Sequence, residues 1–201
     1  RDAQESRGLG DVYKRQKVTV DNETHPVPQP FVVIATENPT GSSGTQMLPE
    51  SQLDRFMIRL SMGYPSHEAA VQILKGQEFT PINTVRMMVT SDELVELQAR
   101  AQCLKVHDSI FDYIVTLIEK TRESEYFSMG ASPRGANALL RMSRAMALLS
   151  GREYVVPEDI ASVFAAVLGH RIKLSSRARA NGFTVDTALE EVRKSVKLPR
   201  T

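Results

Sequence analysis

Three polar side chains, Asn38, Arg55 and Arg134, are of types that can act on a phosphate group. An amide both donates and accepts hydrogen bonds, which suits the orientation of a water molecule beside a phosphoryl group. A guanidinium stabilises the negative charge that develops when that group is transferred. Each residue also has an ordinary structural interpretation. Asn38 could form a turn, Arg55 could pair with Asp54 or Glu50 on the surface, and the stem of Arg134 could lie along an apolar surface.

The position of Asn38 favours the phosphate interpretation. Residues 31–36, FVVIAT, form an apolar, β-branched run without alternation, which predicts a buried, parallel, central strand. Asn38 comes just after this strand, and ligands bind at the carboxyl ends of strands in open α/β sheets. Before it, residues 17–20 alternate like a strand, and 21–22 are turn residues. The proline-rich extension 23–30 completes a predicted hairpin.

Arg55 lies near the end of a short helix predicted over 49–56, and a second strand is predicted over 57–62. A guanidinium at this place, one helix away from the ligand-bearing strand, could be offered to a neighbouring subunit. The breaking sequence Gly63-Tyr64-Pro65 then predicts a domain boundary.

After the boundary almost every segment has helical periodicity. The predicted helices run from Ser66 to Gly76, from Thr90 to Cys103, from His107 onward, from Ser132 to Gly151, from Pro157 to Leu168, and from a cap at Thr184 or Asp186. Arg134 lies in the first turn of the helix that Ser132 and Pro133 begin. Cations are disfavoured there by the helix dipole, whereas phosphates are attracted, so the position hints at an anionic partner.

Composition excludes several other classes of protein. The 201 residues are 41% hydrophobic and 24% charged, with a net charge of +1, which indicates an ordinary globular protein without a general affinity for nucleic acid. No apolar run is long enough to cross a membrane, and the single cysteine, Cys103, favours a reducing cytoplasm. No phosphate-binding G-x-x-x-x-G-K-[ST] loop occurs, and the four scattered histidines predict no metal site.

Three sequence blocks together resemble the MoxR family of AAA+ ATPases. They are FVVIATENP at 31–39, GTQMLPESQLDRFMIRLSMGYPSHEAAVQIL at 44–74, and GASPRGANALLRMSRAMALLSGREYVVPEDI at 130–160. The resemblance covers about nine-tenths of the chain, from about Lys17. It implies an α/β part, namely the C-terminal strands of a parallel P-loop-type sheet with a β-hairpin, followed by an all-α helical lid domain.

The resemblance also implies a role for each candidate residue. Asn38 would be the sensor 1 residue that places the attacking water. Arg55 would be the arginine finger that acts on ATP held by the next subunit, and Arg134 would be sensor 2, reaching the γ-phosphate from the lid. ATP and Mg²⁺ would be the cofactors, yet no Walker A or Walker B motif matches, so the chain alone is expected to be inactive.

By the same resemblance, full-length subunits would form a homo-oligomeric ring, a hexamer, that couples ATP hydrolysis to chaperone-like remodelling of client complexes. A protein with a von Willebrand A domain would be a partner, in the cytoplasm, without a membrane. We expect residues 1–16 to be a disordered or artefactual leader that resembles nothing in the family, 17–65 to be the end of the α/β core, and 66–201 to be the lid. One smaller departure is Val156, where the family has a capping Thr, so the helix at Pro157 should begin less well.

Two other interpretations remain open. The helical part could be a non-enzymatic module that binds a protein, or that binds nucleic acid through the basic segment 170–201, which holds eight Lys or Arg against three acidic residues. Alternatively, the chain could come from another AAA+ relative, such as a magnesium-chelatase-like motor.

Overall fold

The computed structural model describes residues 17–20, 23–37, 48–76 and 84–199, and, of the part up to residue 25, the backbone only. In chain order its elements are β1 (Lys17–Val20), β2 (Glu23–Pro26), α2 (Glu50–Leu53), α3 (His67–Leu74), α4 (Ser91–Cys103), α5 (Asp108–Glu123), β3 (Phe127–Met129), α6 (Pro133–Leu149), α7 (Pro157–Leu168), β4 (Lys173–Leu174), α8 (Ser176–Ala180) and α9 (Val185–Ser195).

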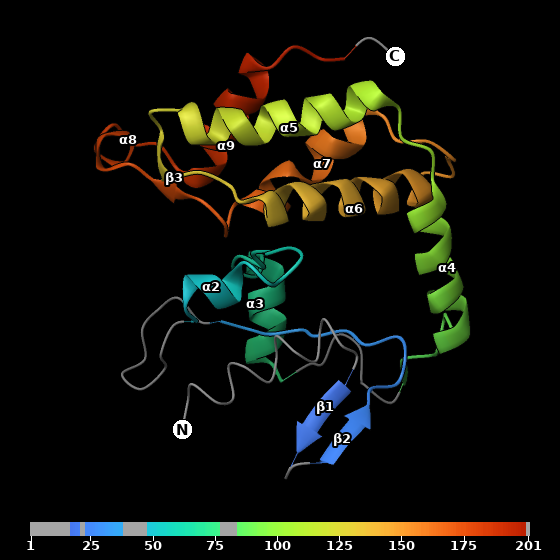
Figure 1. Cartoon of the computed structure of the whole chain (residues 1–201). Coiled ribbons are helices and arrows are strands. Elements are labelled where there is room, and N and C mark those ends of the chain that lie inside the picture. The colour runs from blue at the N-terminus through green and yellow to red at the C-terminus, as the bar shows by residue number, and fades with distance from the viewer. Residues whose placement is uncertain (1–16, 21–22, 38–47, 77–83, 200–201) are drawn as a thin grey trace.

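The hydrophobic core of the described chain lies in its C-terminal helical part. Helix α6 packs against α4, α5 and α7, and α9 packs against α5 and α7 (Figure 1). All members of the buried apolar cluster fall between Leu104 and Val196. Helices α2, α3 and α4 bury no residue. The predicted combination of a small α/β part and an all-α domain is confirmed in this form, with the buried apolar cluster in the C-terminal helical part.

Side-chain caps begin several helices at the predicted residues. The Ser66 hydroxyl accepts a hydrogen bond from the Ala69 N–H, 3.2 Å away. At α4 the Thr90 hydroxyl accepts from the Glu93 N–H, and the Glu93 carboxylate accepts from the Thr90 N–H at 2.7 Å. Such reciprocal bonds satisfy two backbone donors that a helix leaves unpaired. Thr184, rather than Asp186, is the cap of α9.

Helix α7 begins in a different way, because Val156 at its N-cap has no hydroxyl. The Asp159 carboxylate instead accepts from the Val156 N–H at 2.9 Å, and the same carboxylate is paired with Arg152. Asp159 is only 4% exposed, so its charge is held inside the protein by this pairing. The reciprocal half of the cap is lost, as expected, but the first turn keeps an acceptor for its N-terminal donor.

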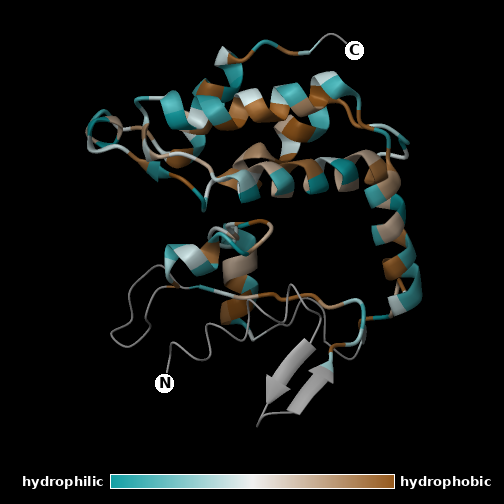
Figure 2. Cartoon of the chain, viewed as in Figure 1, coloured by the Kyte–Doolittle hydropathy of each residue, from teal (hydrophilic) through white to brown (hydrophobic). Residues whose placement is uncertain are grey.

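The predicted hairpin is confirmed, since β1 and β2 pair antiparallel from Lys17↔Pro26 to Val20↔Glu23. The predicted strands over 31–36 and 57–62 are wrong for this structure, because neither segment is a strand. Segment 31–37 is exposed along its length, with Ile34 88% accessible, and it crosses Figure 2 as an extended apolar chain. A strand needs neighbours for its N–H and C=O groups, and the described residues provide none beside this segment.

Three short elements were not predicted. Strands β3 and β4 pair antiparallel, with Phe127 opposite Leu174, and α8 follows them directly. Strands of two or three residues are too short to show an alternating pattern, so periodicity could not identify them.

The loop before α6 is held by the end of α5. The buried Thr121 hydroxyl accepts from the Ala131 N–H at 3.0 Å and donates to the Ile118 carbonyl at 2.6 Å. Arg122 Nε donates to the Ala131 carbonyl at 2.8 Å. A Cβ on Gly130 would lie 2.7 Å from both the backbone carbonyl oxygen of Thr121 and Arg122 Cα, so only glycine fits. These contacts fix where α6, and therefore Arg134, begins.

We predict that Thr121→Val lowers the free energy of unfolding by about 1–3 kcal/mol, because the buried Ala131 N–H loses its acceptor. Thr116→Val is the matched control, since the Thr116 hydroxyl bonds only the Asp112 carbonyl of its own helix. Urea denaturation of the two variants measures the difference. Equal losses would mean that the bridge to Ala131 does not hold the loop.

Candidate functional site

The segment that carries Arg55 is bound to the helical domain. The Arg59 N–H donates to the Ala166 carbonyl in α7 at 2.9 Å. Met57 and Ile58 pack against the buried helical cluster. Residues 54–59 therefore join the α/β part to the lid through both backbone and apolar contacts.

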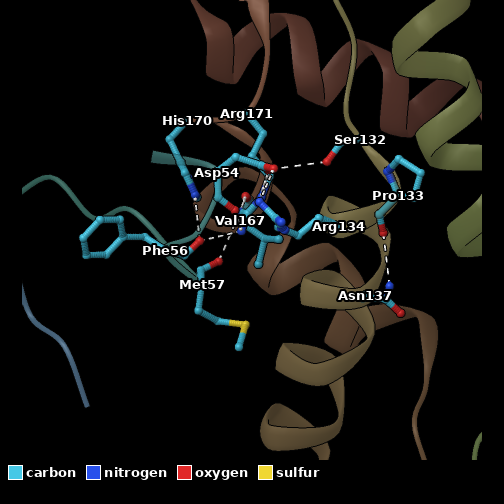
Figure 3. A network of polar contacts seen from close by, with 10 residues as sticks. All are labelled: Asp54, Phe56, Met57, Ser132, Pro133, Arg134, Asn137, Val167, His170 and Arg171. Carbon is cyan, nitrogen blue, oxygen red and sulfur yellow. Dashed lines mark hydrogen bonds and ion pairs between the residues drawn. The ribbon is translucent and has the colours of Figure 1, made fainter. Parts of the chain in front are cut away.

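A buried guanidinium, Arg171, is the centre of this junction (Figure 3). Its side chain is 2% exposed. Nε donates to Asp54 Oδ1 at 3.1 Å, Nη1 donates to the carbonyls of Met57, at 3.2 Å, and Val167, and Nη2 donates to the carbonyls of Asp54, at 3.3 Å, and Phe56. Each of the five N–H groups of the guanidinium thus has an acceptor, which is the condition for burying such a group.

The Asp54 carboxylate is shared by two cations. Oδ1 accepts from Arg171 Nε and, at 3.4 Å, from the Ser132 hydroxyl, while Oδ2 accepts from Arg134 Nη1 at 3.1 Å. The Arg134 side chain is 46% exposed and the Asp54 side chain 24%. The pair with Arg171 is therefore desolvated, whereas the pair with Arg134 lies at the surface, where such pairs are worth about 0–1 kcal/mol.

The start of α6 explains why Arg134 lies here. Ser132 is the N-cap residue but makes no side-chain cap bond, because its hydroxyl is directed at Asp54. The first turn contains no acidic residue. The positive end of the helix dipole and the Arg134 guanidinium thus coincide, and the nearby negative charge comes from Asp54, which is 80 residues away in sequence. This arrangement suits an anionic ligand.

Arg55 is exposed, and within the described chain its side chain makes no hydrogen bond or ion pair. Both partners that the sequence suggested for it are bound to other cations. Asp54 holds Arg134 and Arg171, and Glu50 pairs with Lys173. The structure therefore brings Arg134 beside the residue that precedes Arg55, while the Arg55 side chain takes no part in this network.

Asn38 lies outside the described residues, so its predicted place at a strand end is not tested. Its neighbour Glu37 accepts a hydrogen bond from the Leu48 N–H at 3.2 Å. Asp54, His170 and Arg171 are site residues that sequence reasoning did not identify as such. Asp54 was noticed only as a partner for Arg55, and nothing in the sequence Gly169-His170-Arg171 indicated a function.

His170 lies beside Arg171 and is 8% exposed. Nε2 donates to the Phe56 carbonyl at 3.1 Å, so Nδ1 is the nitrogen that must accept a proton, and Nδ1 is buried without a hydrogen-bond partner among the described residues. Burial, and secondarily the charge of Arg171, lowers the pKa of His170 from 6.5 to about 4. The ring is therefore neutral at physiological pH and contributes no further cation.

The described residues contain no cluster of three His, Cys, Asp or Glu side chains that could bind a metal ion. No helix in the described part of the chain is long and apolar enough to cross a membrane.

Two family models match the chain. One, described as the ATPase family associated with various cellular activities (AAA), matches residues 2–58, and the other, the AAA lid domain, matches residues 119–192. The first match begins within the predicted leader 1–16, so it argues against treating that segment as foreign to the family.

Individual relatives match nearly the whole chain. The protein YeaC of Bacillus subtilis is 40% identical over 90% of this chain and 57% of its own length. The chaperone MoxR1 of Mycobacterium tuberculosis is 35% identical over 96% of this chain and 53% of its own. The crystal structure of a candidate ATPase from Cytophaga hutchinsonii superposes with a TM-score of 0.85 at 30% identity, over 98% of this chain and 63% of that one. The chain thus spans little more than half the length of these curated relatives.

We predict that acid destabilises the helical domain through His170. A histidine whose pKa is lowered to about 4 in the fold, against 6.5 when unfolded, stabilises the fold fully above pH 6.5, and this contribution is lost as the pH falls toward 4. The resulting decrease in the free energy of unfolding is of the order of 3 kcal/mol. His170→Gln, which can still donate to Phe56 but does not titrate, should show a shallower decline in urea denaturation between pH 7 and pH 4. An equally steep decline in both proteins would contradict this cause.

Proposed function

The chain belongs to the MoxR family of AAA+ ATPases, and from that premise we propose that it supplies the arginine finger and the sensing lid of a ring-forming ATPase. The observation that supports this most is the Asp54 carboxylate. Asp54 directly precedes the exposed Arg55, and its carboxylate binds Arg134 at the start of a lid helix. In the proposal, Arg134 acts at the ATP site of its own subunit and Arg55 at that of the next subunit, in a homo-oligomeric, hexameric ring.

The described residues fit one end of a nucleotide. Arg134 and the Ser132 hydroxyl, at the N-terminus of α6, whose first turn contains no acidic residue, bind the Asp54 carboxylate in this structure, and in the proposal a γ-phosphate would take the place of that carboxylate on Arg134. ATP would supply the phosphoryl group, and Mg²⁺ would neutralise its charge. Their main ligands would be Walker motifs, which this sequence lacks. We therefore propose that these 201 residues alone hydrolyse no ATP.

The two arginines would act at different moments of the reaction. Arg134 would bind the γ-phosphate and so draw the start of α6 toward the nucleotide, which moves the lid against the core. Arg55, with its side chain exposed, would stabilise the charge on the phosphoryl group held by the neighbouring subunit. Asn38, by its position in the motif, would orient the attacking water.

The work done by hydrolysis is proposed from the relatives. MoxR1 is named as a chaperone, which supports an ATP-driven remodelling or maturation of client protein complexes. We keep a von Willebrand A domain protein as the proposed partner and the cytoplasm as the proposed location. The basic C-terminal segment does not favour nucleic acid, because Arg177, Arg193 and Lys194 each pair with a glutamate.

Arg55→Ala in the full-length protein should lower kcat for ATP on the order of a thousandfold, the usual scale for an arginine finger supplied in trans. Since the Arg55 side chain is exposed and makes no hydrogen bond or ion pair with a described residue, thermal unfolding should change little. Arg179→Ala removes another exposed arginine and is the control, with unchanged turnover expected. ATPase assays on both rings measure the effect, and wild-type turnover by the Arg55 variant would refute the assignment.

Arg134→Ala should also reduce hydrolysis, while the fold stays intact because Asp54 keeps its buried partner Arg171. The lost surface pair should cost less than about 1 kcal/mol in unfolding free energy. Denaturation and ATPase assays on the same preparation separate the two effects. Loss of the folded state would instead indicate that Arg134 is structural.

A further inference from the structure

We propose that Arg171 is the residue that positions the arginine finger. Its buried guanidinium holds the backbone on both sides of Arg55, so the direction of the finger depends on the lid of its own subunit. This inference rests on the proposed role of Arg55 and names a positioning residue for the same reaction.

The acceptors of Arg171 surround the finger in sequence. They are the carboxylate and carbonyl of Asp54, just before Arg55, and the carbonyls of Phe56 and Met57, just after it. His170 adds a second bond to the Phe56 carbonyl, at 3.1 Å. Residues on both sides of Arg55 are thus fixed by two adjacent lid residues (Figure 3), and the Arg55 side chain is exposed.

The geometry requires a planar fork of donors. Lysine has three donors on one nitrogen, whereas the Arg171 guanidinium spreads five donors over a carboxylate and four carbonyls, including that of Val167 in α7. Arg171 thereby connects the segment that carries Arg55 directly to the last turn of α7. A rotation of α7 against the core would move the backbone around the finger.

Asp54 couples the bonds that Arg171 makes around Arg55 to the proposed nucleotide site of the same subunit. Its Oδ1 binds Arg171 and its Oδ2 binds Arg134. When Arg134 leaves Asp54 for a phosphate, the carboxylate keeps Arg171 alone. The contacts around Arg55 therefore change with the state of the subunit's own site, while Arg55 acts on the next one.

This placement makes a prediction that a merely structural residue would not. A positioning residue for the finger affects catalysis mainly from the subunit that donates the finger. A residue that serves its own ATP site affects catalysis only from the subunit that holds the ATP.

Mixed rings of the full-length protein test the difference. The acceptor subunit carries Arg55→Ala but keeps an intact ATP site, which needs a finger from its neighbour. The donor subunit keeps Arg55 but has its Walker B acid replaced, so it cannot hydrolyse ATP itself. Only the mixture hydrolyses ATP.

Arg171→Lys in the donor should lower kcat by about 10- to 100-fold, the scale of a misplacement of about 1 Å. The KM for ATP should stay within about twofold of its original value, because the acceptor site is untouched. Arg171→Lys in the acceptor should have a clearly smaller effect, because there it reaches the ATP site only through Asp54 and Arg134. Arg179→Ala in the donor is the matched control.

The alternative outcomes are distinct. An equal effect from donor and acceptor, or an effect from the acceptor alone, overturns the inference while leaving Arg55 as the finger. Turnover by rings in which every subunit carries Arg55→Ala overturns both proposals. If thermal unfolding and ring assembly show that Arg171→Lys does not fold, His170→Ala carries the same comparison, since it removes the neighbouring bond to the Phe56 carbonyl, at 3.1 Å, and leaves Arg134 and Asp54 unchanged. A donor-specific loss again supports the inference, and its absence overturns it.

Discussion

A guanidinium removed from water must find an acceptor for each of its N–H groups, and Arg171 finds them on two separate parts of the chain. One acceptor is the carbonyl of Val167 within the helical domain, and the others belong to Asp54, Phe56 and Met57. Removing the Asp54 carboxylate would leave the buried charge without a counter-charge, which usually costs about 3–5 kcal/mol. This requirement, together with the apolar contacts of Met57 and Ile58, fixes how residues 54–59 lie on the helical domain. Arg134 pairs with the same carboxylate that Arg171 holds in place.

Local signals predicted most of the helices. Ser66, Thr90 and Thr184 each cap a helix as expected, because a cap depends on residues only three positions apart. The run at 31–36 failed as a strand for the opposite reason. Its composition was right for a buried strand, but a strand exists only beside another, and the described chain offers it no neighbour. Composition shows that a segment is suited to a buried strand, but neighbouring strands determine whether the segment forms one.

The candidate site was predicted only in part, for a similar reason. Motif resemblance identified Arg55 and Arg134, because their sequence surroundings are distinctive. It missed Arg171, whose bonds to Asp54 span 117 residues and leave no local pattern. The sequence also could not predict that Nδ1 of His170 is buried without a hydrogen-bond partner among the described residues, since the burial of one ring nitrogen depends on tertiary packing. The assignment of Asn38 still rests on the motif alone.

Gly135 gives the arrangement a further property. A Cβ at this position would lie 3.2 Å from Leu168 Cδ2 and 3.4 Å from Arg171 Cδ, so the absence of a side chain sets how closely α6 approaches the end of α7. The spacing between these two helices therefore depends on a residue that has no side chain of its own. A methyl group here would meet Leu168 before Arg171, so it would change the approach of α6 to α7 without removing any polar group of the candidate site.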